Sequence, residues 1–497
     1  MTAGPAAARA AAPPRPLPPG MALALDPATR RIDGGTVLVG GSPLRLLRLT
    51  AAGTRLVDRL AAGEPVPDRP AAQHLARRLL DAGMAHPRLA RTVPPWSVAD
   101  VAAVVPAHDR PGGLARTLDR LGGVREAVVV DDGSTDAAAT AAVASRAGAR
   151  LIRHGRAQGP SAARNAGWRA VDAPVVAFVD ADVEPDPGWL EPLLAHLADE
   201  EVAAVAPRVV PLDVRGAPRW LVAYEAARSP LDLGTREGVV RPGSPVPYVP
   251  TTALVVRRDA LDAAGGFDEA MAYGEDVDLV WRLAGAGRTV RYEPAAVVRH
   301  PVRATFGGWL RQRHAYGSSA APLAARHDGA VAPLTVSGWS AAAWGLVLAG
   351  APLAGAALGA ATTAALVPRL RGLRHPGREA LRLAGLGNLL AGRQVADALR
   401  RAWLPLAVPL ALHRRSRPAL VAALLVPALV EAAERRPDLD LARWTALRLA
   451  DDVAYGTGLW AGSVRARSTA ALRPAFAGRF PPPGGEPAAA GVPAGGR

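Results

Sequence analysis

The sequence predicts an α/β protein with a mostly parallel sheet, which follows a small module of strands and helices and precedes a hydrophobic helical region. Three observations predict this organisation. Apolar runs of strand length at 101–108, 125–136 and 174–182 alternate with segments of helical spacing, which is typical of a mostly parallel sheet. Residues 21–95 contain short strands followed by helices. From Gly329 to Pro368 no residue is charged.

Composition limits the possible functions. The 497 residues are enough for two to four domains. All 59 basic residues are arginine, against 44 acidic residues, and the net charge is +15. Without cysteine the chain forms no disulfides or cysteine-bound metal sites, which fits a reducing compartment. Aromatic residues make up only 4% of the chain, so base-stacking side chains are scarce and we expect no nucleic-acid partner.

The chain is predicted to divide into five segments. Residues 1–20 and 476–497 are rich in Pro, Gly and Ala and are predicted to be disordered tails. Between them we expect a module at 21–95, a catalytic domain at 97–325 and a hydrophobic helical region at 326–475. The N-terminal stretch has arginines and prolines where a signal peptide has an apolar run, so export by that route is not expected.

The module at 21–95 begins with two predicted strands, "MALALDP" and "GTVLVGG", with "RRIDGG" as the turn between them. Leucines at helical spacing predict a helix over 42–63, and "AAQHLARRLLDAGMAHP" predicts a second helix that ends at Gly83. The arrangement resembles the winged-helix-like PqqD-like peptide-recognition domains. A purely structural cap is the alternative interpretation.

Polar side chains follow the three predicted strands of the catalytic domain. His108 follows the first, Asp131 and Asp132 end the second, and Asp180 and Asp182 follow the third. In an extended segment residues i and i+2 point the same way, so Asp180 and Asp182 can address one cation together. Mg²⁺ or Mn²⁺ is usually held by one or two carboxylates and by substrate phosphates. The alternative is a surface turn with two solvated acids.

Two predicted helix starts carry further polar residues. Gly159, Arg164 and Asn165 lie where a helix begins, and backbone N–H groups there favour anions. Glu275 and Asp276 crowd the start of another helix at 273–283, where plain N-terminal caps are also acidic. For the first pattern the alternative is a solvated helix start, and for the second it is a plain acidic N-terminal cap.

Five motifs in order carry a resemblance to a known family: "VVVDDGSTD", "GPSAARNAG", "FVDADV", "GGFDEAMAYGEDVDLVWRL" and "VRHP". Together they resemble the family 2 glycosyltransferases, which have the GT-A fold with a mixed, nucleotide-sugar-binding sheet. The resemblance implies a nucleotide-sugar donor, a divalent cation (Mn²⁺ or Mg²⁺) and inversion at the sugar's anomeric carbon. The processive members carry Gln-x-x-Arg-Trp, which Gln312 to Tyr316 do not match, so long-chain polymerisation is not expected.

The resemblance also implies roles for individual residues. Asp276, with Glu275 beside it, corresponds to the catalytic base. Asp182, Asp180 and His300 correspond to the metal-binding residues. The implied donor-binding residues are Pro106, His108, Asp131, Asp132, Gly159, Arg164, Asn165 and Asp180. Acceptor or diphosphate contacts are implied for Arg311, Arg313 and Trp281.

The order of the parts is similar to that in the mycofactocin-system branch of this family, with "RRIDGGTVLVGGSPLRLLRLT" carrying the closer resemblance. It implies transfer of a hexose, glucose from UDP-glucose, to a peptide-derived redox cofactor or its precursor. A lipid or cell-envelope glycan acceptor is the first alternative. A sugar-1-phosphate nucleotidyltransferase is the second, although no Gly-rich start precedes residue 131. A non-enzymatic binder would leave the acidic strand ends unexplained.

The segment 326–475 combines apolar runs with arginine. The uncharged stretch 329–368 is long enough to span a bilayer, and the runs at 402–412 and 418–430 are shorter. Arg400, Arg401, Arg414 and Arg415 flank the shorter runs. This pattern predicts association with a membrane surface at the cytoplasmic face of the cell membrane. A soluble all-helical appendage is the alternative.

Overall fold

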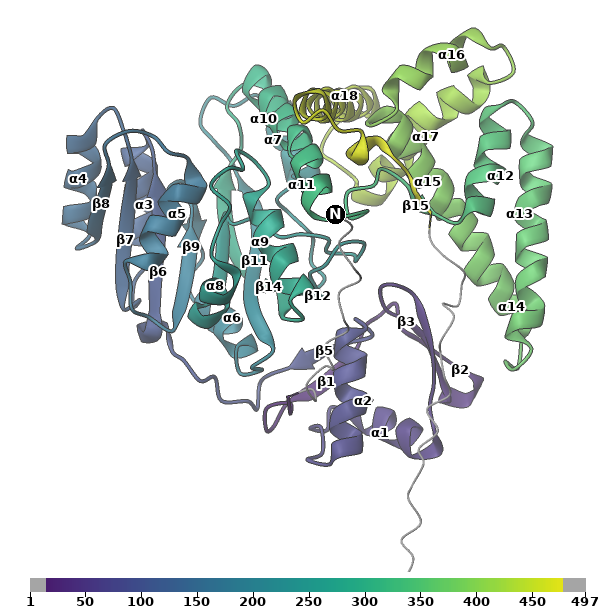
Figure 1. Ribbon diagram of the computed structural model, residues 1–497, viewed down its shortest axis with the longest axis horizontal. Helices are drawn as coiled ribbons and strands as arrows, with labels where there is room; N and C mark the ends of the chain where they lie inside the picture. Colours follow the sequence, from purple (N-terminus) through teal and green to yellow (C-terminus); the bar gives the residue numbers. More distant parts are fainter. Residues whose placement is uncertain (1–14, 477–497) are drawn as a thin grey trace, which may run out of the picture. The chain divides into compact units, whose positions relative to one another are not determined.

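The computed structural model describes residues 15–476 as two compact units (Figure 1). The first unit comprises residues up to 331 together with 429–468, and the second comprises 332–428 and the residues from 469 on. Residues 1–14 and 477–497, most of the two predicted tails, lie outside the described residues. Leu17, assigned to the N-terminal tail, is 5% exposed and packs in the core of the module, so the module begins before residue 21.

The N-terminal module consists of two small sheets and two helices. Its elements are β1 (Ala22–Leu25), β2 (Arg30–Ile32), β3 (Val37–Gly40), β4 (Arg45–Arg48), α1 (Ala51–Ala61), α2 (Pro70–Asp81) and β5 (Ala85–Arg88). Strands β1 and β5 pair with each other, and β2, β3 and β4 form an antiparallel meander.

The helix predicted over 42–63 is wrong in its first half. Residues 45–48 form strand β4, in which Leu47 pairs with Leu38 of β3. Helix α1 cannot begin earlier because the Thr50 side chain caps it by accepting from the Gly53 amide at 3.1 Å. The predicted turn at 30–35 likewise contains a strand, β2, before the turn itself.

The central sheet is mixed. Its strands are β6 (Val101–Ala107), β7 (Glu126–Asp132), β8 (Arg150–His154), β9 (Val175–Val179), β10 (Glu184–Pro185), β11 (Val202–Leu212), β12 (Gly238–Val239), β13 (Ala253–Arg257) and β14 (Thr289–Pro301). Their order is β10-β14-β11-β13-β9-β6-β7-β8, with β12 also on β14. Strands β9, β6, β7 and β8 are parallel, whereas β13 is antiparallel to both of its neighbours. Strands β11 and β14 also pair in parallel, and β10 and β12 run antiparallel to β14. Most strands of the sheet therefore run in one direction, as the alternation of strands and helices predicted, and the antiparallel strands β10, β12 and β13 make the sheet mixed.

Helices cover both faces of this sheet. Helices α3 (Pro111–Asp119), α4 (Ala137–Arg146) and α6 (Leu190–His196) pack on one face, and α5 (Pro160–Arg169), α8 (Arg258–Ala264) and α9 (Glu275–Gly285) pack on the other. Because side chains alternate along a strand, Phe178 of β9 enters one core while Val179 enters the other. The apolar run before Asp180 is therefore buried on both sides.

Three further helices of the first unit pack around an aromatic cluster. Helices α7 (Arg219–Arg228), α10 (Phe306–Ser318) and α18 (Leu441–Arg465) contribute Tyr224, Trp309 and Trp444 respectively, and α11 (Ala320–Arg326) follows α10. The Tyr224 and Trp309 rings meet edge to face at 5.5 Å between centroids. Helix α10 is therefore packed against α7 and α18 through this cluster.

The close contact between α10 and α18 depends on glycine. A Cβ built at Gly458 of α18 would overlap the carbonyl oxygen of His314 in α10. Because the overlap is with backbone atoms, we expect overpacking in Gly458→Ala to cost about 3 kcal/mol, the upper end of the usual range, which exceeds the roughly 1 kcal/mol that alanine contributes to helix propensity. Chemical denaturation should show a net loss of stability. Gly285→Ala in α9, where a Cβ meets open space, should cause none.

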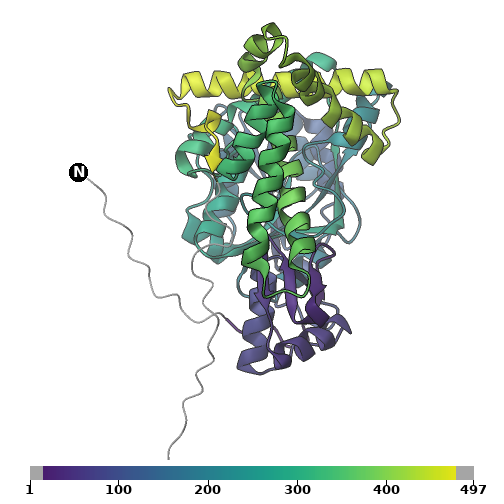
Figure 2. The ribbon, with the colours of Figure 1, turned by 90° about the vertical axis from the view of Figure 1, so that its right-hand side faces the viewer.

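The second unit is mainly helical. Its elements are β15 (Thr335–Val336), α12 (Gly338–Leu348), α13 (Pro352–Leu366), α14 (Pro376–Ala380), α15 (Leu386–Arg400), α16 (Ala407–Leu412), the first part of α17 (Arg417–Arg435) and β16 (Ala475–Phe476). Helices α12 and α13 lie side by side (Figure 2). Within the described residues one helical segment, Pro352–Leu370, has the length and apolar composition needed to cross a membrane.

Candidate active site

The polar strand ends meet at one edge of the central sheet. The chain runs from β6 to β7 and β8 on one side and then adds β9 on the other side of β6. Open α/β sheets bind ligands beyond the carboxyl ends of the strands at such a reversal of strand order. His108 follows β6 and Asp180 follows β9, so both lie at this position. His300, predicted to follow a short strand, instead lies inside the 13-residue strand β14.

Asp131 and Asp132 at the end of β7 are held rigidly by the protein. Asp131 is fully buried, accepts from the Ser134 amide at 2.9 Å and pairs with Arg153. Asp132 accepts from the amides of Gln158 and Gly159 at 2.9 and 2.7 Å. The start of α5 was predicted to offer backbone amides to an anion. In the structure the two amides that precede it, those of Gln158 and Gly159, donate to the Asp132 carboxylate instead.

The adjacent strand ends are tied to the same region. The His108 ring contacts the Asp132 carbonyl oxygen through Nδ1 at 2.9 Å, and His154 Nδ1 lies 2.8 Å from the Asp132 carboxylate. Pro106 lies in β6 opposite Val130 of β7. These contacts form one wall of the site.

Arg164 connects two acidic motifs that are far apart in the sequence. It is 4% exposed, and its two terminal nitrogens donate to Asp180 at 2.8 Å and to Glu275 at 2.9 Å. Asp180 follows β9, whereas Glu275 begins α9. The bridge brings the start of α9 to the edge of the sheet.

Asp276, the residue after Glu275, has the properties of a general base. Its carboxylate accepts from the Val277 amide at 2.8 Å. Burial and the adjacent Glu275 carboxylate raise the pKa of Asp276 to about 7, although Arg164 acts in the opposite direction. A carboxylate with a pKa near the working pH combines sufficient basicity with sufficient ionised fraction.

Asp182 and His300 form the best candidate for binding a cation. His300 Nε2 lies 3.7 Å from an Asp182 oxygen, and Asp182 also pairs with Arg110. Burial lowers the pKa of His300, which favours the neutral imidazole that binds metals. Within residues 15–476 no cluster of three such ligands occurs. One or two protein ligands are nevertheless enough for Mg²⁺ or Mn²⁺ when substrate phosphates complete the shell, so the donor set fits.

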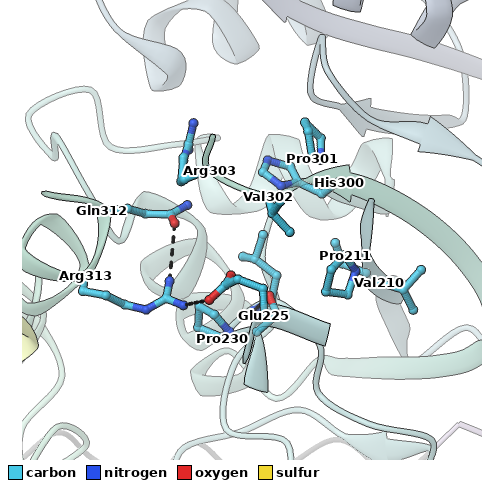
Figure 3. Close-up of a pocket in the computed structure, with 13 residues that line it drawn as sticks. Val210, Pro211, Glu225, Pro230, His300, Pro301, Val302, Arg303, Gln312 and Arg313 are labelled. Carbon is cyan, nitrogen blue, oxygen red and sulfur yellow. Dashed lines mark hydrogen bonds and ion pairs between the residues drawn. The ribbon is translucent and has the colours of Figure 1, made fainter. Parts of the chain in front are cut away.

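A pocket lies beside His300, between the ends of β11 and β14 and helices α7 and α10 (Figure 3). Its polar lining residues are Glu225, Ser229, His300, Arg303, Gln312 and Arg313. Arg313 is not available to a ligand because it is buried and pairs with Glu225 and, at 3.1 Å, with Asp451. Arg303, in contrast, has no ion pair with any carboxylate of the described chain, so it is the available cation of this pocket. Sequence reasoning missed Arg303, although "HPVR" places it three residues after His300.

Three other predicted site residues lie elsewhere or have structural partners. Asn165 accepts from the Phe267 amide and donates to the Phe267 carbonyl, both at 2.9 Å, so it fastens that turn. Trp281 is buried in the core and donates to the Pro247 carbonyl at 2.7 Å. Arg311 is exposed on α10 and donates to the Gly307 carbonyl at 3.3 Å.

The fold is an α/β fold whose candidate site lies at the carboxyl edge of the sheet, where such folds bind ligands. Residues 102–265 match the model of the glycosyl transferase family 2. The chain is 41% identical over 474 residues to the pre-mycofactocin glycosyltransferase of Mycobacterium tuberculosis, which covers 92% of this chain and 98% of the relative. The chain belongs to the family 2 glycosyltransferases.

More distant relatives match the catalytic region. The chain is 27% identical over 242 residues to polypeptide N-acetylgalactosaminyltransferase 15 of Homo sapiens, covering 43% of this chain and 38% of that relative. A solved mannosyltransferase of Pyrobaculum calidifontis, in complex with GDP-Man and Mn²⁺, is similar with a TM-score of 0.36 and 20% identity, covering 70% of this chain and 89% of that one.

Proposed function

We propose that the protein transfers a hexose, glucose from UDP-glucose, to a hydroxyl group of a mycofactocin precursor, with inversion at the anomeric carbon. The observation that carries this proposal is the 41% identity to a pre-mycofactocin glycosyltransferase over 92% of the chain. The N-terminal module, which we propose to be PqqD-like, would present the peptide-derived acceptor to the catalytic domain.

In the proposed mechanism Asp276 is the general base. It accepts the proton of the acceptor hydroxyl as that oxygen forms a bond to the sugar C1, while the bond from C1 to the diphosphate oxygen breaks on the opposite face. Asp131 and Asp132 form the wall against which the nucleoside binds. Arg164 keeps Asp180 and α9 in register through its two ion pairs.

Asp182 and His300 would hold a divalent cation, which neutralises charge on the departing diphosphate when it is bound. Arg303 lines the pocket next to His300 and, within the described residues, contacts only the neutral side chain of Gln312, at 3.2 Å, and no carboxylate. We therefore assign Arg303 to the diphosphate oxygens.

Removing the Arg303 charge tests this assignment. In Arg303→Met we expect kcat/KM for the donor to fall roughly 10- to 100-fold, the loss that one or two hydrogen bonds to a charged group produce. Steady-state kinetics would measure the loss. Arg120→Met, on the surface of the catalytic domain, removes the same charge and should leave the kinetics unchanged. An equal loss in both variants would contradict the assignment.

The raised pKa of Asp276 sets the direction of the pH dependence. Only ionised Asp276 accepts a proton, so its active fraction rises with pH through about 7. We expect kcat/KM to increase roughly tenfold per pH unit well below pH 7 and to level off above it. A profile that is flat from pH 5 to 8 would exclude Asp276 as the group that limits the rate.

A donor panel tests the whole proposal. The purified full chain is incubated with UDP- and GDP-sugars in Mn²⁺, Mg²⁺ or EDTA, and release of nucleoside diphosphate is followed with and without mycofactocin precursor. We expect release from UDP-glucose that requires metal and is accelerated by the precursor. Acceleration by a lipid or glycan acceptor, but not by the precursor, would redirect the proposal to that acceptor. Absence of release from every donor with every acceptor would refute it.

A further inference from the structure

The exposed charge of the second unit has a single sign. Residues 332–428 contain eleven arginines and only two acidic residues. Nine of the arginines are exposed: Arg369, Arg371, Arg374, Arg378, Arg382, Arg393, Arg414, Arg415 and Arg417. Glu379 is buried, and Asp397 is half-buried and pairs with Arg400. Every exposed charge in this segment is therefore positive.

An apolar stripe on α15 faces solvent among these arginines. Leu386, Leu389 and Leu390 are 52%, 65% and 59% exposed. They lie at positions i, i+3 and i+4, which share one face of a helix. The opposite face carries Val395 and Leu399, which are buried in the core of the unit. Helix α15 is therefore held in the core through its other face, and these three leucines remain exposed to solvent.

Arginines stand at both ends of this stripe. Arg382 precedes Leu386 by four residues, in the π-helical turn before α15, and Arg393 follows Leu390 by three. Helix α17 repeats the pattern, with exposed Arg417, Val421 and Leu425 at intervals of four residues. We name the outward stripe on α15, Leu386, Leu389 and Leu390 with Arg382 and Arg393, the arginine–leucine surface.

We propose that the arginine–leucine surface docks the enzyme onto a membrane that contains anionic lipid. Leucines on an in-plane helix can enter the boundary between headgroups and acyl chains, while the long arginine side chains reach the phosphates. Each basic residue near an anionic surface strengthens binding. We do not expect this surface to bind the same surface of a second copy of the protein, because two faces whose exposed charges are all positive repel each other. The inference does not depend on the acceptor or donor of the proposed reaction.

Co-sedimentation of the full chain with vesicles tests the proposal. We compare phosphatidylcholine vesicles with vesicles that also contain phosphatidylglycerol, at low and high salt. We expect binding to the anionic vesicles to be at least about tenfold tighter than to the neutral ones and to weaken with salt. Equal binding to both vesicles, or no binding to either, would overturn the proposal.

Paired variants locate the surface. Leu386→Ser/Leu389→Ser/Leu390→Ser and Arg382→Gln/Arg393→Gln should each weaken anionic-vesicle binding roughly tenfold or more. Leu441→Ser/Val464→Ser and Arg120→Gln/Arg146→Gln change exposed residues of the first unit and should bind as the unchanged protein does. Circular dichroism confirms that each variant is folded.

Two results in the variants would overturn the assignment. One is an equal loss of vesicle binding in the control variants, because it would show that the effect is not specific to this surface. The other is a change of sedimentation coefficient without lipid in the triple serine variant while vesicle binding is kept. That outcome would assign the leucines to self-association.

Discussion

Asp276→Asn is expected to reduce glycosyl transfer by roughly 10²- to 10⁴-fold, the range for loss of a general base. The amide keeps the size of the carboxyl group and its hydrogen bond to the helix start, but it cannot accept the hydroxyl proton. Donor affinity should change little, because Asp276 is assigned to the acceptor side. Single-turnover kinetics together with donor binding by calorimetry separate the two quantities.

A matched control is Asp262→Asn in α8, which removes an exposed carboxylate of the same catalytic domain. It should leave transfer unchanged. If Asp276→Asn instead lost donor affinity with an unchanged transfer step, the residue would belong to the donor site. If it transferred sugar at the rate of the unchanged protein, the assigned mechanism would be wrong.

The catalytic domain was largely readable from the sequence because its buried strands leave a strong pattern. The run Val175–Val179 is apolar throughout, since helices cover both faces of the sheet, and its abrupt change at Asp180 marks the edge where the candidate site lies. The parallel order of β6, β7 and β9 followed from the helices between them. The antiparallel strand β13 was hidden because only tertiary pairing determines its direction.

The N-terminal module was harder to predict because its signals are short. Leu46 and Leu47 fit a helical spacing as well as a strand, and pairing with β3 decides between them. The cap at Thr50, which sets the start of α1, is seen only in the structure. Local patterns of four residues do not decide between strand and helix when tertiary contacts supply the energy.

Individual site residues were the least predictable because their partners are distant in the sequence. In the sequence Arg313 resembles a ligand-binding arginine. In the structure it pairs with Glu225 and Asp451, which lie on two other helices. Arg303 carries no such partner among the described carboxylates, a property that no local motif encodes. Arg164 was expected to contact the donor, whereas in the structure its two terminal nitrogens pair with Asp180 and Glu275.

Arg164→Gln is therefore expected to have two separable consequences. Removing one partner of a buried ion pair leaves charge uncompensated and costs about 3–5 kcal/mol of stability. In addition, Asp276 loses a nearby positive charge that opposes the effects of burial and of Glu275 on its pKa. The pKa of Asp276 should rise, and the midpoint of the pH–activity profile should move above its value in the unchanged protein.

Arg77→Gln distinguishes a positioning role from a purely structural one. Arg77 is equally buried and pairs with Asp199 at 2.7 Å, away from the assigned catalytic residues. Its loss should destabilise the fold to a similar extent and leave the midpoint of the pH profile in place. Arg164→Lys keeps a cation beside Asp180 and Glu275, so its midpoint should lie between those of Arg164→Gln and the unchanged protein. An unshifted midpoint in Arg164→Gln would show that Arg164 supports the fold without tuning the base, because the electrostatic effect on Asp276 would then be absent.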